Sequence, residues 1–572
     1  MNQKSYFRII MVIAMVLMLK GICPAQSRSL ERLFIATDRP FYVAGESIWL
    51  SLYCFDLSIS TYAFSSLSVV AYIELRDAES LLSTAKLRIH NGRGSGRLEL
   101  PLTLPTGNYR LLAYTKQMLN EEYPAYYDAV IPVYNTLSLE QNDDRVTTDV
   151  DRILTMNMIA PSVSNDNGIE IRMPDGKETV KRNSLISVSL LNTSEVATTL
   201  NVSVHKWDPH EPPSLHIVDY LSEDRTYIPN VHFSNKYVSE YEGEVIRGKI
   251  SMIELSEAAE KSVFLSAVGQ NVDVYASPID TVSGELVFFT NSLYGNREVA
   301  LDFPYENKNE AVFELYDPFV KPTITPIPKL FLDKKLSSSL EERSIEMQLF
   351  HRFGIDTLYD QIYIDDDPLL YEQPVVYDLD DYTRFPDMQD VMIEFVKEIR
   401  FRKMEGKPTL QIAVETDLDR SLLSQGPLVV VDGIALFDHT HIFNYDPLKV
   451  KTISVYRNWF YKIGTHHFGG IAKFNTYSGH YQGLTFGGNV KIFDYQGVQY
   501  PCRFTGREVV KDPNLPDIRS LLYWDPQVDI EPQSQQEIHI NTSSVPGRYV
   551  VVVEGITGNG KPLFIRSEFV VQ

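Results

Sequence analysis

The sequence predicts a chain built mainly of β-sandwich modules in series, with one α/β module in its C-terminal half. Apolar or alternating runs of about five to nine residues, separated by Gly, Pro and Asn, recur along most of the chain. Helical periodicity is confined to two stretches, 338–354 and 386–399. A length of 572 residues corresponds to several modules of about 100 to 150 residues each.

Three β-sandwich modules are expected in the first part of the chain. The first spans 30–137 and contains the runs "SIWLSLYCF", "LSVVAYIEL" and "NYRLLAYT". An Asp-rich link precedes the second, at 150–215, which contains "SLISVSLLN" and "TTLNVSVHKWD". The third spans 239–320, from "EVIRGKISMIEL" to "AVFELYDPF". The stretch 209–240 is rich in Pro, His and aromatic residues without a clean period, which predicts a long loop.

Helices are expected only after the third module. The segment 321–379 is predicted to be a linker with a helix, in which Ser339 and Glu342 form a capping box and Gly354 ends the helix. A second helix is predicted to begin at the capping residue Asp387. Its apolar residues follow the spacing of one buried face: Met388, Val391, Met392, Phe395 and Val396.

The remaining chain is predicted to form an α/β module at 380–480 and a C-terminal β-sandwich at 481–572. A weak internal echo relates the last module to the first. The stretches "LPTGNYRLLAYT" and "VPGRYVVVVEG" both place Pro and Gly before a tyrosine, Tyr109 or Tyr549, that opens an apolar strand. We expect both tyrosines to be structural, because this arrangement is typical of a sandwich corner.

The charge balance excludes one class of partner. The formal net charge is -22 and the pI is near 5.0. Nucleic-acid binding requires clustered Lys and Arg, so we expect no nucleic-acid partner.

The N-terminus has the pattern of an export signal, with Lys4 and Arg8 before an apolar run and Ala25 at its end. The run from Ile9 to Leu19 is shorter than the roughly 20 residues that span a bilayer. Removal of 1–25 is therefore favoured over an uncleaved anchor. Lipidation of Cys23 remains an alternative, although Ile22 stands where a small residue would be expected.

Only Cys54 and Cys502 remain after removal of the signal. An oxidising compartment would permit a disulfide between them. Cys54, however, is in phase with Ile48, Leu50 and Leu52 on one strand face, which favours a buried thiol.

The stretch "TDRPFYVAGESIWLSLYCFD", from Thr37 to Asp56, resembles the opening of a macroglobulin domain of the alpha-2-macroglobulin family. Pro40 stiffens the entry, and Gly45 supplies the turn before the first long strand. The Gly-Cys-Gly-Glu-Gln run of thioester-containing macroglobulins is absent from the sequence. The resemblance therefore implies macroglobulin-like, Ig-like sandwiches without covalent trapping.

The stretch "GPLVVVDGIALFDHTHIFNYDPLKVKTISVYRN" resembles the plug domain of TonB-dependent outer-membrane receptors, and Asp432 and Gly433 lie in its signature. The stretch 481–572 is too short for a barrel of about 22 strands. The resemblance thus implies a plug-like module without a barrel. Its aromatic residues, Trp459 and Tyr461 among them, are expected to meet a protein partner, because aromatic side chains are common in interfaces. The alternative is that Trp459, Phe460 and Tyr461 cover the neighbouring module.

The combination of these modules resembles a family of exported proteins from Bacteroidetes. It implies a non-enzymatic binding or scaffolding protein of an outer-membrane complex, located in the periplasm or at the cell surface. Membrane association would come through a partner, and no cofactor is expected. One alternative is a thioester-less macroglobulin-type endopeptidase inhibitor, with 209–240 as its bait segment.

A second alternative is a metal-dependent hydrolase. His439 and His441, with Asp438, could hold zinc together with His466 or His467, but exposed loop histidines more often face solvent. The acidic stretches "YIDDDPLLY" and "YDLDDY" lack the Gly and Glu positions of an EF-type calcium loop, so solvated loops are favoured.

Overall fold

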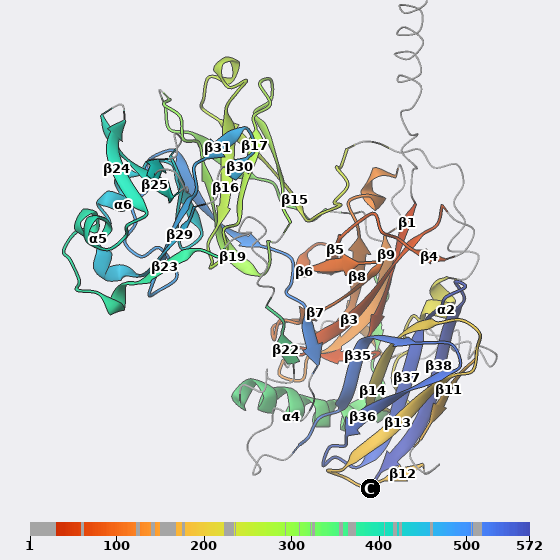
Figure 1. The fold of residues 1–572 in the computed structure, drawn as a ribbon. Coiled ribbons are helices and arrows are strands. Elements are labelled where there is room, and N and C mark those ends of the chain that lie inside the picture. Colours follow the sequence, from red (N-terminus) through yellow and green to blue (C-terminus); the bar gives the residue numbers. More distant parts are fainter. Residues whose placement is uncertain are drawn as a thin grey trace, which may run out of the picture.

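A computed structural model describes most of the chain and shows a mainly β protein, which confirms the predicted fold class. The elements form two lobes (Figure 1). The described residues are 30–58, 62–121, 126–138, 144–148, 168–173, 178–221, 234, 236–291, 293–307, 309–320, 322, 326–353, 359–363, 373–404, 406–415, 420–422, 426–457, 461–504, 506 and 517–572. The expected signal segment, with Cys23, lies outside them.

The first lobe begins with the N-terminal sandwich, which comprises β1 to β9. Strand β6 belongs to both layers, because it pairs with β5 along its length and with β7 at its end, where His90 lies opposite Arg93. The sheet order is β1-β3-β7-β6-β5-β8-β9-β2, with β4 beside β3. The strands are β1 (Glu31–Thr37), β2 (Tyr42–Val43), β3 (Ser47–Asp56), β4 (Ala63–Phe64), β5 (Val70–Arg76), β6 (Leu81–His90), β7 (Arg93–Glu99), β8 (Gly107–Tyr114) and β9 (Tyr127–Tyr134).

The second sandwich of this lobe is discontinuous, since it combines strands from two distant parts of the chain. Its two sheets have the orders β11-β13-β36 and β12-β38-β37-β14-β35. Figure 1 shows the blue C-terminal strands interleaved with the yellow ones. The strands are β11 (Ile169–Arg172), β12 (Thr179–Val180), β13 (Leu185–Asn192), β14 (Thr198–Lys206), β35 (Leu521–Ile530), β36 (Ser534–Asn541), β37 (Gly547–Thr557) and β38 (Pro562–Val571).

The expected modules 150–215 and 481–572 are therefore halves of one sandwich, and the prediction of two separate modules was wrong. Strand β14 pairs with β35 on one side and with β37 on the other. One apolar core joins residues of both halves, such as Val202 and Val551. Periodicity along the sequence identifies a strand but not its partner, which is why the two halves seemed independent.

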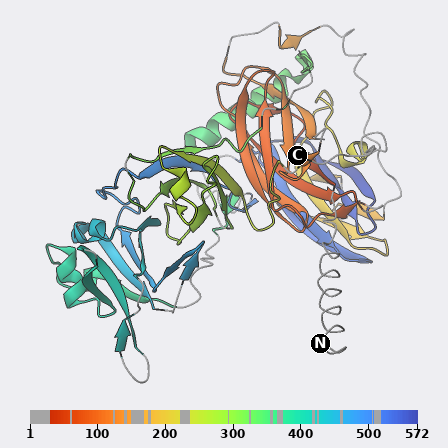
Figure 2. The ribbon, with the colours of Figure 1, turned by 90° about the horizontal axis from the view of Figure 1, so that it is seen from above.

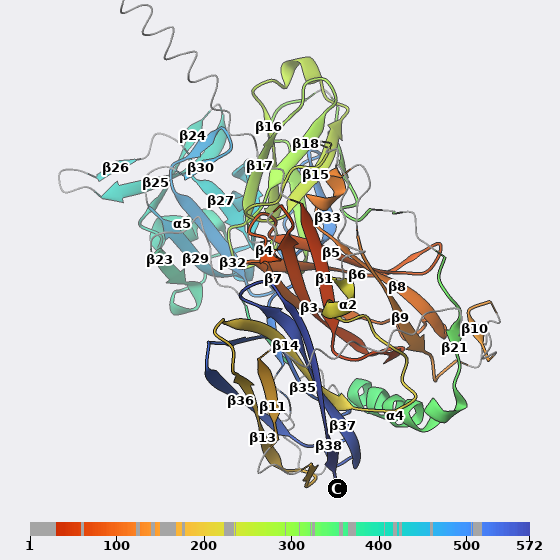
Figure 3. The same ribbon diagram turned by 90° about the vertical axis from the view of Figure 1, so that its right-hand side faces the viewer.

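The second lobe contains the third sandwich, and this sandwich is also completed by a late strand. Its sheets are β18-β15-β20 and β17-β16-β19-β33. Figure 3 shows β33 near these strands, and it pairs with β19. This strand lies outside the range 239–320 that the sequence predicted for the third sandwich. The strands are β15 (Val245–Ser251), β16 (Ser262–Ala267), β17 (Val274–Pro278), β18 (Glu285–Phe289), β19 (Asn296–Asp302), β20 (Val312–Leu315) and β33 (Val490–Gln496).

The α/β module, residues 375–476, forms the outer end of the second lobe. Its main sheet has the order β23-β29-β32-β27-β28, and only β27 and β32 run parallel. The third sandwich lies between this module and the N-terminal sandwich (Figure 2). The strands are β23 (Val375–Asp378), β24 (Ile399–Met404), β25 (Lys407–Glu415), β26 (Arg420–Leu422), β27 (Leu428–Val431), β28 (Ile434–Leu436), β29 (Val450–Tyr456), β30 (Tyr461–Ile463), β31 (His466–Phe468) and β32 (Ile471–Thr476).

Helix α4 (Ser337–Phe353) occupies the predicted linker, but the predicted capping box was wrong. The chain enters α4 through a 3-10 turn, η5 (Lys334–Leu336), which Asp333 caps. Ser339 instead donates a hydrogen bond to Asp208, and Glu342 pairs with Lys206. The helix starts one turn early because Asp333 caps the preceding turn, which leaves both side chains for contacts between modules. The expected stop at Gly354 lies outside the described residues.

Helix α5 (Met388–Glu394) follows the sequence prediction. The Asp387 carboxylate accepts the N–H of Asp390 at 2.9 Å, as expected for an N-cap. Met388, Val391 and Met392 are buried against the main sheet of the α/β module. The other helical turns are α2 (Ile217–Tyr220), α6 (Thr440–Phe443), η1 (Met118–Asn120), η4 (Leu255–Glu257), η7 (Leu379–Asp381) and η8 (Pro447–Lys449).

Two small strand pairs connect the first lobe to the segments that leave it. They are β10 (Val146–Thr147) with β21 (Leu330–Phe331), and β22 (Tyr359–Gln361) with β34 (Cys502–Phe504). Across the part of the chain that the structure describes, no helix has the length and apolar character needed to cross a membrane.

The discontinuous sandwich should depend on Tyr549, which opens β37 and has no solvent exposure. We predict that Tyr549→Ala lowers the free energy of unfolding by about 3 to 5 kcal/mol, because a buried ring is lost. Tyr549→Phe keeps the ring and should cost about 1 kcal/mol. Thermal denaturation of both variants measures this, and an unchanged melting temperature for the alanine variant would contradict it.

Candidate functional site

Asp432, from the sequence signature, lies in a turn that joins the α/β module to the third sandwich. Its φ is 46°. Its carboxylate accepts hydrogen bonds from the N–H groups of Thr476 and Tyr481, both at 2.7 Å, and from the Thr476 hydroxyl at 2.5 Å. Its carbonyl accepts the N–H of Gly269 at 3.0 Å. Asp432 is thus fully engaged in holding the turn.

Gly433 allows the two modules to approach closely at this turn. Its φ is +90°, and a Cβ atom at this position would lie 2.1 Å from the carbonyl oxygen of Ala267. The neighbouring Ala435 donates its N–H to the hydroxyl of Ser266 at 3.2 Å. Only glycine fits both the positive φ and the contact with backbone, so the Asp-Gly signature marks a joint between modules.

An apolar core surrounds this joint, and Tyr461 packs against it. Residues of the third sandwich, such as Phe264, pack with residues of the α/β module, such as Val430 and Phe468, and Tyr461 is partly buried against them. The Phe264 and Phe437 rings are 4.3 Å apart. Tyr461 therefore covers the neighbouring sandwich in part, which is the alternative that the sequence left open. Trp459 lies outside the described residues.

Gly45 lies at a second joint, between the N-terminal sandwich and α4. Its φ is +94°, and a Cβ here would lie 2.5 Å from Leu102 and 3.2 Å from the sulfur of Met347 in α4. Its carbonyl oxygen is 2.8 Å from Nε2 of His351, also in α4. The turn that the sequence assigned to Gly45 thus also seats the helix.

Tyr109 and Tyr549 occupy equivalent places in two sandwiches. The Tyr109 hydroxyl donates to the carbonyl of Pro105 at 2.6 Å, and the Tyr549 hydroxyl donates to the carbonyl of Val545 at 3.1 Å. Both rings are buried, and burial raises the pKa of Tyr109 to about 12. This hydrogen bond to a carbonyl a few residues upstream is the geometry of a tyrosine corner.

A buried ion pair connects the two lobes. Lys86 in β6 and Glu244, which precedes β15, are almost fully buried, and their Nζ and Oε1 atoms are 2.5 Å apart. The Tyr495 hydroxyl donates to the same Glu244 oxygen at 2.6 Å. Lys86 also donates to the carbonyl of Gln496 at 2.6 Å. Removing one member would leave a buried charge unpaired, which costs several kcal/mol.

Glu240 adds a second carboxylate to this inter-lobe joint. It accepts hydrogen bonds from the Tyr72 hydroxyl at 2.8 Å and from the Val245 N–H at 2.9 Å. Burial raises the pKa of Glu240 to about 7. Burial also lowers the pKa of Lys116, which lies over the Tyr72 ring, to about 8. The protonation state of this joint therefore changes near neutral pH.

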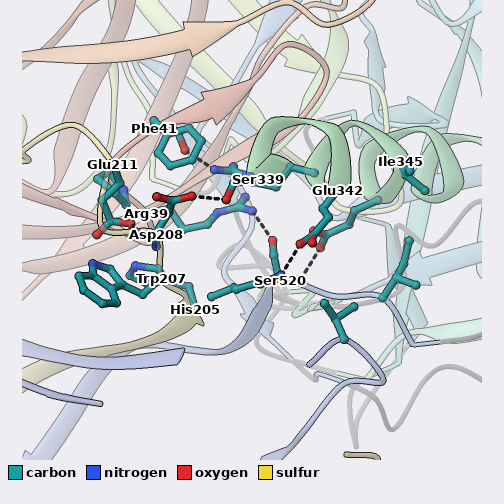
Figure 4. Close-up of a pocket in the computed structure, with 16 residues that line it drawn as sticks. Arg39, Phe41, His205, Trp207, Asp208, Glu211, Ser339, Glu342, Ile345 and Ser520 are labelled. Atoms are coloured by element: carbon teal, nitrogen blue, oxygen red, sulfur yellow. Dashed lines mark hydrogen bonds and ion pairs between the residues drawn. The ribbon is translucent and has the colours of Figure 1, made fainter. Parts of the chain in front are cut away.

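A cavity of about 200 Å³ lies where the two sandwiches of the first lobe meet α4 (Figure 4). Arg39 bonds Asp38 at 2.8 Å and lies 3.4 Å from Glu46, which also pairs with Arg343 of α4. Burial would lower the pKa of Arg39, but Glu46 and Asp38 raise it above its usual value. Both guanidinium groups are thus neutralised, and together they hold the entry turn against the helix.

The discontinuous sandwich closes the other side of this cavity. Ser520 donates its N–H to Glu346 of α4 at 2.9 Å and its hydroxyl lies 3.3 Å from Arg39 (Figure 4). Burial, followed by the field of Arg39, lowers the pKa of His205 to about 3, so its imidazole is neutral. These contacts bring residues from three distant segments together in one charge network.

Glu211 is a carboxylate of the cavity without a close cation in the described part of the chain. Among the described residues no basic group lies within 4.0 Å of its carboxylate, and burial raises its pKa to about 7. It lines the 200 Å³ cavity and an adjoining one of about 310 Å³. His205 and Trp207 lie in the same two walls. The contacts around the cavity join the two sandwiches of the first lobe to α4.

Three of the five candidate zinc ligands are engaged in other contacts. His439 is buried, its Nδ1 accepts the N–H of Leu410 at 3.0 Å, and burial lowers its pKa to about 4. Asp438 is 3.2 Å from Lys407, and His466 is 2.8 Å from the Tyr305 hydroxyl. Within the described ranges, no group of three or more His, Cys, Asp or Glu is placed to hold a metal ion.

The acidic stretches and the cysteines have separate positions. Asp378 caps η7, and Asp380 pairs with Arg384 and the Tyr477 hydroxyl.

The first acidic stretch, 365–367, lies outside the described residues, as does much of the proposed bait segment, 222–233. Cys54 is buried and Cys502 is half-buried, both as free thiols, and burial raises the pKa of each.

Comparison with known proteins provides no family assignment. No family model matches the sequence, and no curated protein matches it. Among solved structures, the chain is similar to native Escherichia coli alpha-2-macroglobulin at 10% identity and a TM-score of 0.24, over 96% of this chain and 40% of that one. Salmonella alpha-2-macroglobulin reacted with methylamine gives 9% identity and a TM-score of 0.22, over 95% and 39%.

Other solved structures are equally distant. Latent PorU from Porphyromonas gingivalis has 8% identity and a TM-score of 0.14, with 95% of this chain and 34% of that chain covered. The chain spans about 40% of the length of the macroglobulin chains. Overlaps at such TM-scores carry no argument about family or function.

Sequence reasoning missed the residues of the charge networks. Arg343 and Glu346 are buried on one face of α4, and Lys86 is buried within β6. Charged residues are expected at the surface, so an apolar pattern does not reveal them. The one available signal was the three-residue spacing of Arg343 and Glu346 within a helix of low apolar content.

The joint at Gly433 can be tested with a matched pair of glycine variants. We predict that Gly433→Ala destabilises the protein by more than about 1 kcal/mol, because it combines a positive φ with a clash against backbone. Gly479 also has a positive φ, +68°, but nothing lies within 4 Å of its Cβ position. Gly479→Ala should therefore show only the cost of a positive φ in a residue with a Cβ atom, without a steric clash.

Hydrogen exchange of the peptides that contain β16 and β28 measures this difference. Exchange should rise in both peptides for Gly433→Ala and stay near the wild-type rate for Gly479→Ala. Equal exchange in the two variants would mean that close approach at Gly433 does not hold the modules together.

The inter-lobe joint predicts a pH dependence of stability. A carboxyl group with a raised pKa keeps its proton in the folded protein at pH values where the unfolded chain has lost it. The stability that Glu240 contributes is therefore present below pH 4.5 and lost as the pH rises through about 7. We expect a loss of roughly 1 to 3 kcal/mol across this window.

Burial also raises the pKa values of Glu211 and Asp302 to about 7, so the pH dependence of the wild type contains their contributions too. Glu240→Gln isolates the contribution of Glu240. The variant should show a smaller decrease in melting temperature between pH 5 and pH 7.5 than the wild type. Exposed Glu254→Gln is the control and should leave the decrease unchanged. Parallel curves for the wild type and Glu240→Gln would contradict the prediction.

Proposed function

We propose that the protein is an exported, non-enzymatic scaffolding component of a bacterial envelope complex, which presents its α/β module to a protein partner. The observation that carries this proposal is a set of buried ion pairs between separate parts of the chain. Lys86 with Glu244, and Arg39 and Arg343 with Glu46, all join different segments or modules. Such networks fix relative positions, as a scaffold requires.

The groups that catalysis would use also have structural partners, which supports a non-enzymatic role. Asp432 accepts three hydrogen bonds in its turn, and His439 accepts one from the backbone. Cys54 has no solvent exposure, and burial raises the pKa of its thiol. A reactive cysteine would need access and a lowered pKa.

Among the described residues, one face of the α/β module is turned away from the third sandwich. It contacts the third sandwich through β27, β28 and the Asp432–Gly433 turn, whereas β23 and α5 lie on the side away from that sandwich (Figure 1). Val376 in β23 and Ile393 in α5 are 56% and 54% exposed. Under this proposal, these two side chains lie on the face that meets the partner.

Site-specific photo-cross-linking in whole cells tests this assignment. A photoreactive residue at Val376 or Ile393 should form a discrete adduct with an envelope protein. The controls place the same residue at Leu185 in the discontinuous sandwich and at Val282 in the third sandwich, which are 64% and 89% exposed. Adducts that form equally from all four positions, or only from the controls, would contradict presentation by the α/β module.

Export is tested separately by fractionation of cells that contain the tagged protein. We expect the tag in the envelope fraction. Recovery of the tag from the cytoplasm alone would contradict the proposed location, whatever the cross-linking result.

A further inference from the structure

A wide groove lies between the two lobes and borders the joints described above, since Gly269, Tyr495 and Gln496 line it and also contact residues of those joints. Its volume is about 1590 Å³, which exceeds the roughly 300 to 1,000 Å³ of typical small-molecule sites. Its walls come from the N-terminal sandwich at Thr84, from the third sandwich at 268–271 and 294–298, and from the α/β module at His480. A groove of this size suits a chain molecule.

A row of three tyrosines forms one wall of the groove. Tyr294 and Tyr500 are stacked, with ring centroids 5.4 Å apart and planes at 25°, and Tyr363 lies 5.2 Å from Tyr500. Gly295 makes room for this stack, because a Cβ there would lie 2.8 Å from the Tyr500 ring. Tyr363 is 72% exposed and provides an aromatic surface for a ligand.

Amide side chains lie along the same groove. Gln270, Asn271 and Asn296 line it, and within the described part of the chain none of these three side chains has a hydrogen-bond partner. An amide both donates and accepts hydrogen bonds. The groove therefore offers several unused donors and acceptors next to an aromatic surface.

The charged groups of the groove include Arg297, Glu298 and Asp494. Arg297 pairs with Asp273 at 2.7 Å, and Glu298 accepts the Tyr481 hydroxyl at 2.7 Å. The walls are fixed across the lobes, because the Gln496 amide exchanges hydrogen bonds of 2.8 and 2.9 Å with Thr84. Arg297 is already paired, and the carboxylates of Glu298 and Asp494 disfavour an anionic ligand, so a neutral ligand fits this groove better than an anion. The hydrogen bonds between Gln496 and Thr84 favour a groove that is already formed.

We propose that this groove binds a neutral oligosaccharide. A sugar ring has an apolar C–H face that packs on an aromatic ring and a rim of hydroxyls that donate and accept hydrogen bonds. A peptide would need pockets for its alternate side chains, whereas the aliphatic residue of the lining, Val268, is buried. The inference goes beyond the scaffolding role and uses none of the residues that carry it.

Isothermal titration with the purified full chain tests the proposal. The probes are maltohexaose, cellohexaose and chitohexaose, which are neutral and differ in linkage and substituents. At least one should bind with a Kd of about 1 mM or tighter. Tyr363→Ala should weaken that binding about tenfold or more, and Asn296→Ala should weaken it in the same direction. Circular dichroism verifies that both variants fold.

Tyr241→Ala is the matched control, since Tyr241 is 52% exposed and lies outside the groove. Its Kd should stay within about twofold of the wild type. The proposal is overturned if none of the three sugars binds, or if Tyr363→Ala binds as well as the wild type. It is also overturned if a peptide library is retained through Tyr363 and the sugars are not.

Discussion

The pairing of β14 with β35 and β37 is the constraint on which the rest of the architecture depends. It brings residues 198–206 between strands 521–530 and 547–557, so the intervening chain must leave the first lobe and return to it. Closing so long a loop has an entropic cost that grows only slowly with length. The shared core of this sandwich offsets that cost and fixes where the inserted chain begins and ends.

A sandwich completed by a strand distant in sequence also occurs inside the inserted chain. Strand β33, which follows the α/β module in the chain, pairs with β19, which precedes it. The third sandwich is therefore complete only when the residues on both sides of the module are in place. Buried polar contacts at each boundary, such as those of Glu244 and Asp432, then specify one arrangement of neighbours, since an alternative packing would leave these groups unpaired.

The sequence was sufficient for features that depend on local pattern. The strands, the cap at Asp387 and the turns at Gly45 and Gly433 follow from alternation, side-chain chemistry and positive φ. The joints could not be predicted, because the pairing of Lys86 with Glu244 or of Arg343 with Glu46 leaves no periodic trace. The macroglobulin-like and plug-like resemblances indicated kinds of module but not which distant segments complete each one.

The order of the elements has a mechanical consequence. The chain enters the third sandwich at β15, returns to the first lobe for β21, α4 and β22, goes out again to β23, and comes back after β33. The two lobes are thus tethered by four lengths of backbone instead of one. A force applied to the outer module would be divided among several tethers. Rotation about a single linker, the usual freedom of modules arranged in series, is not available to this molecule.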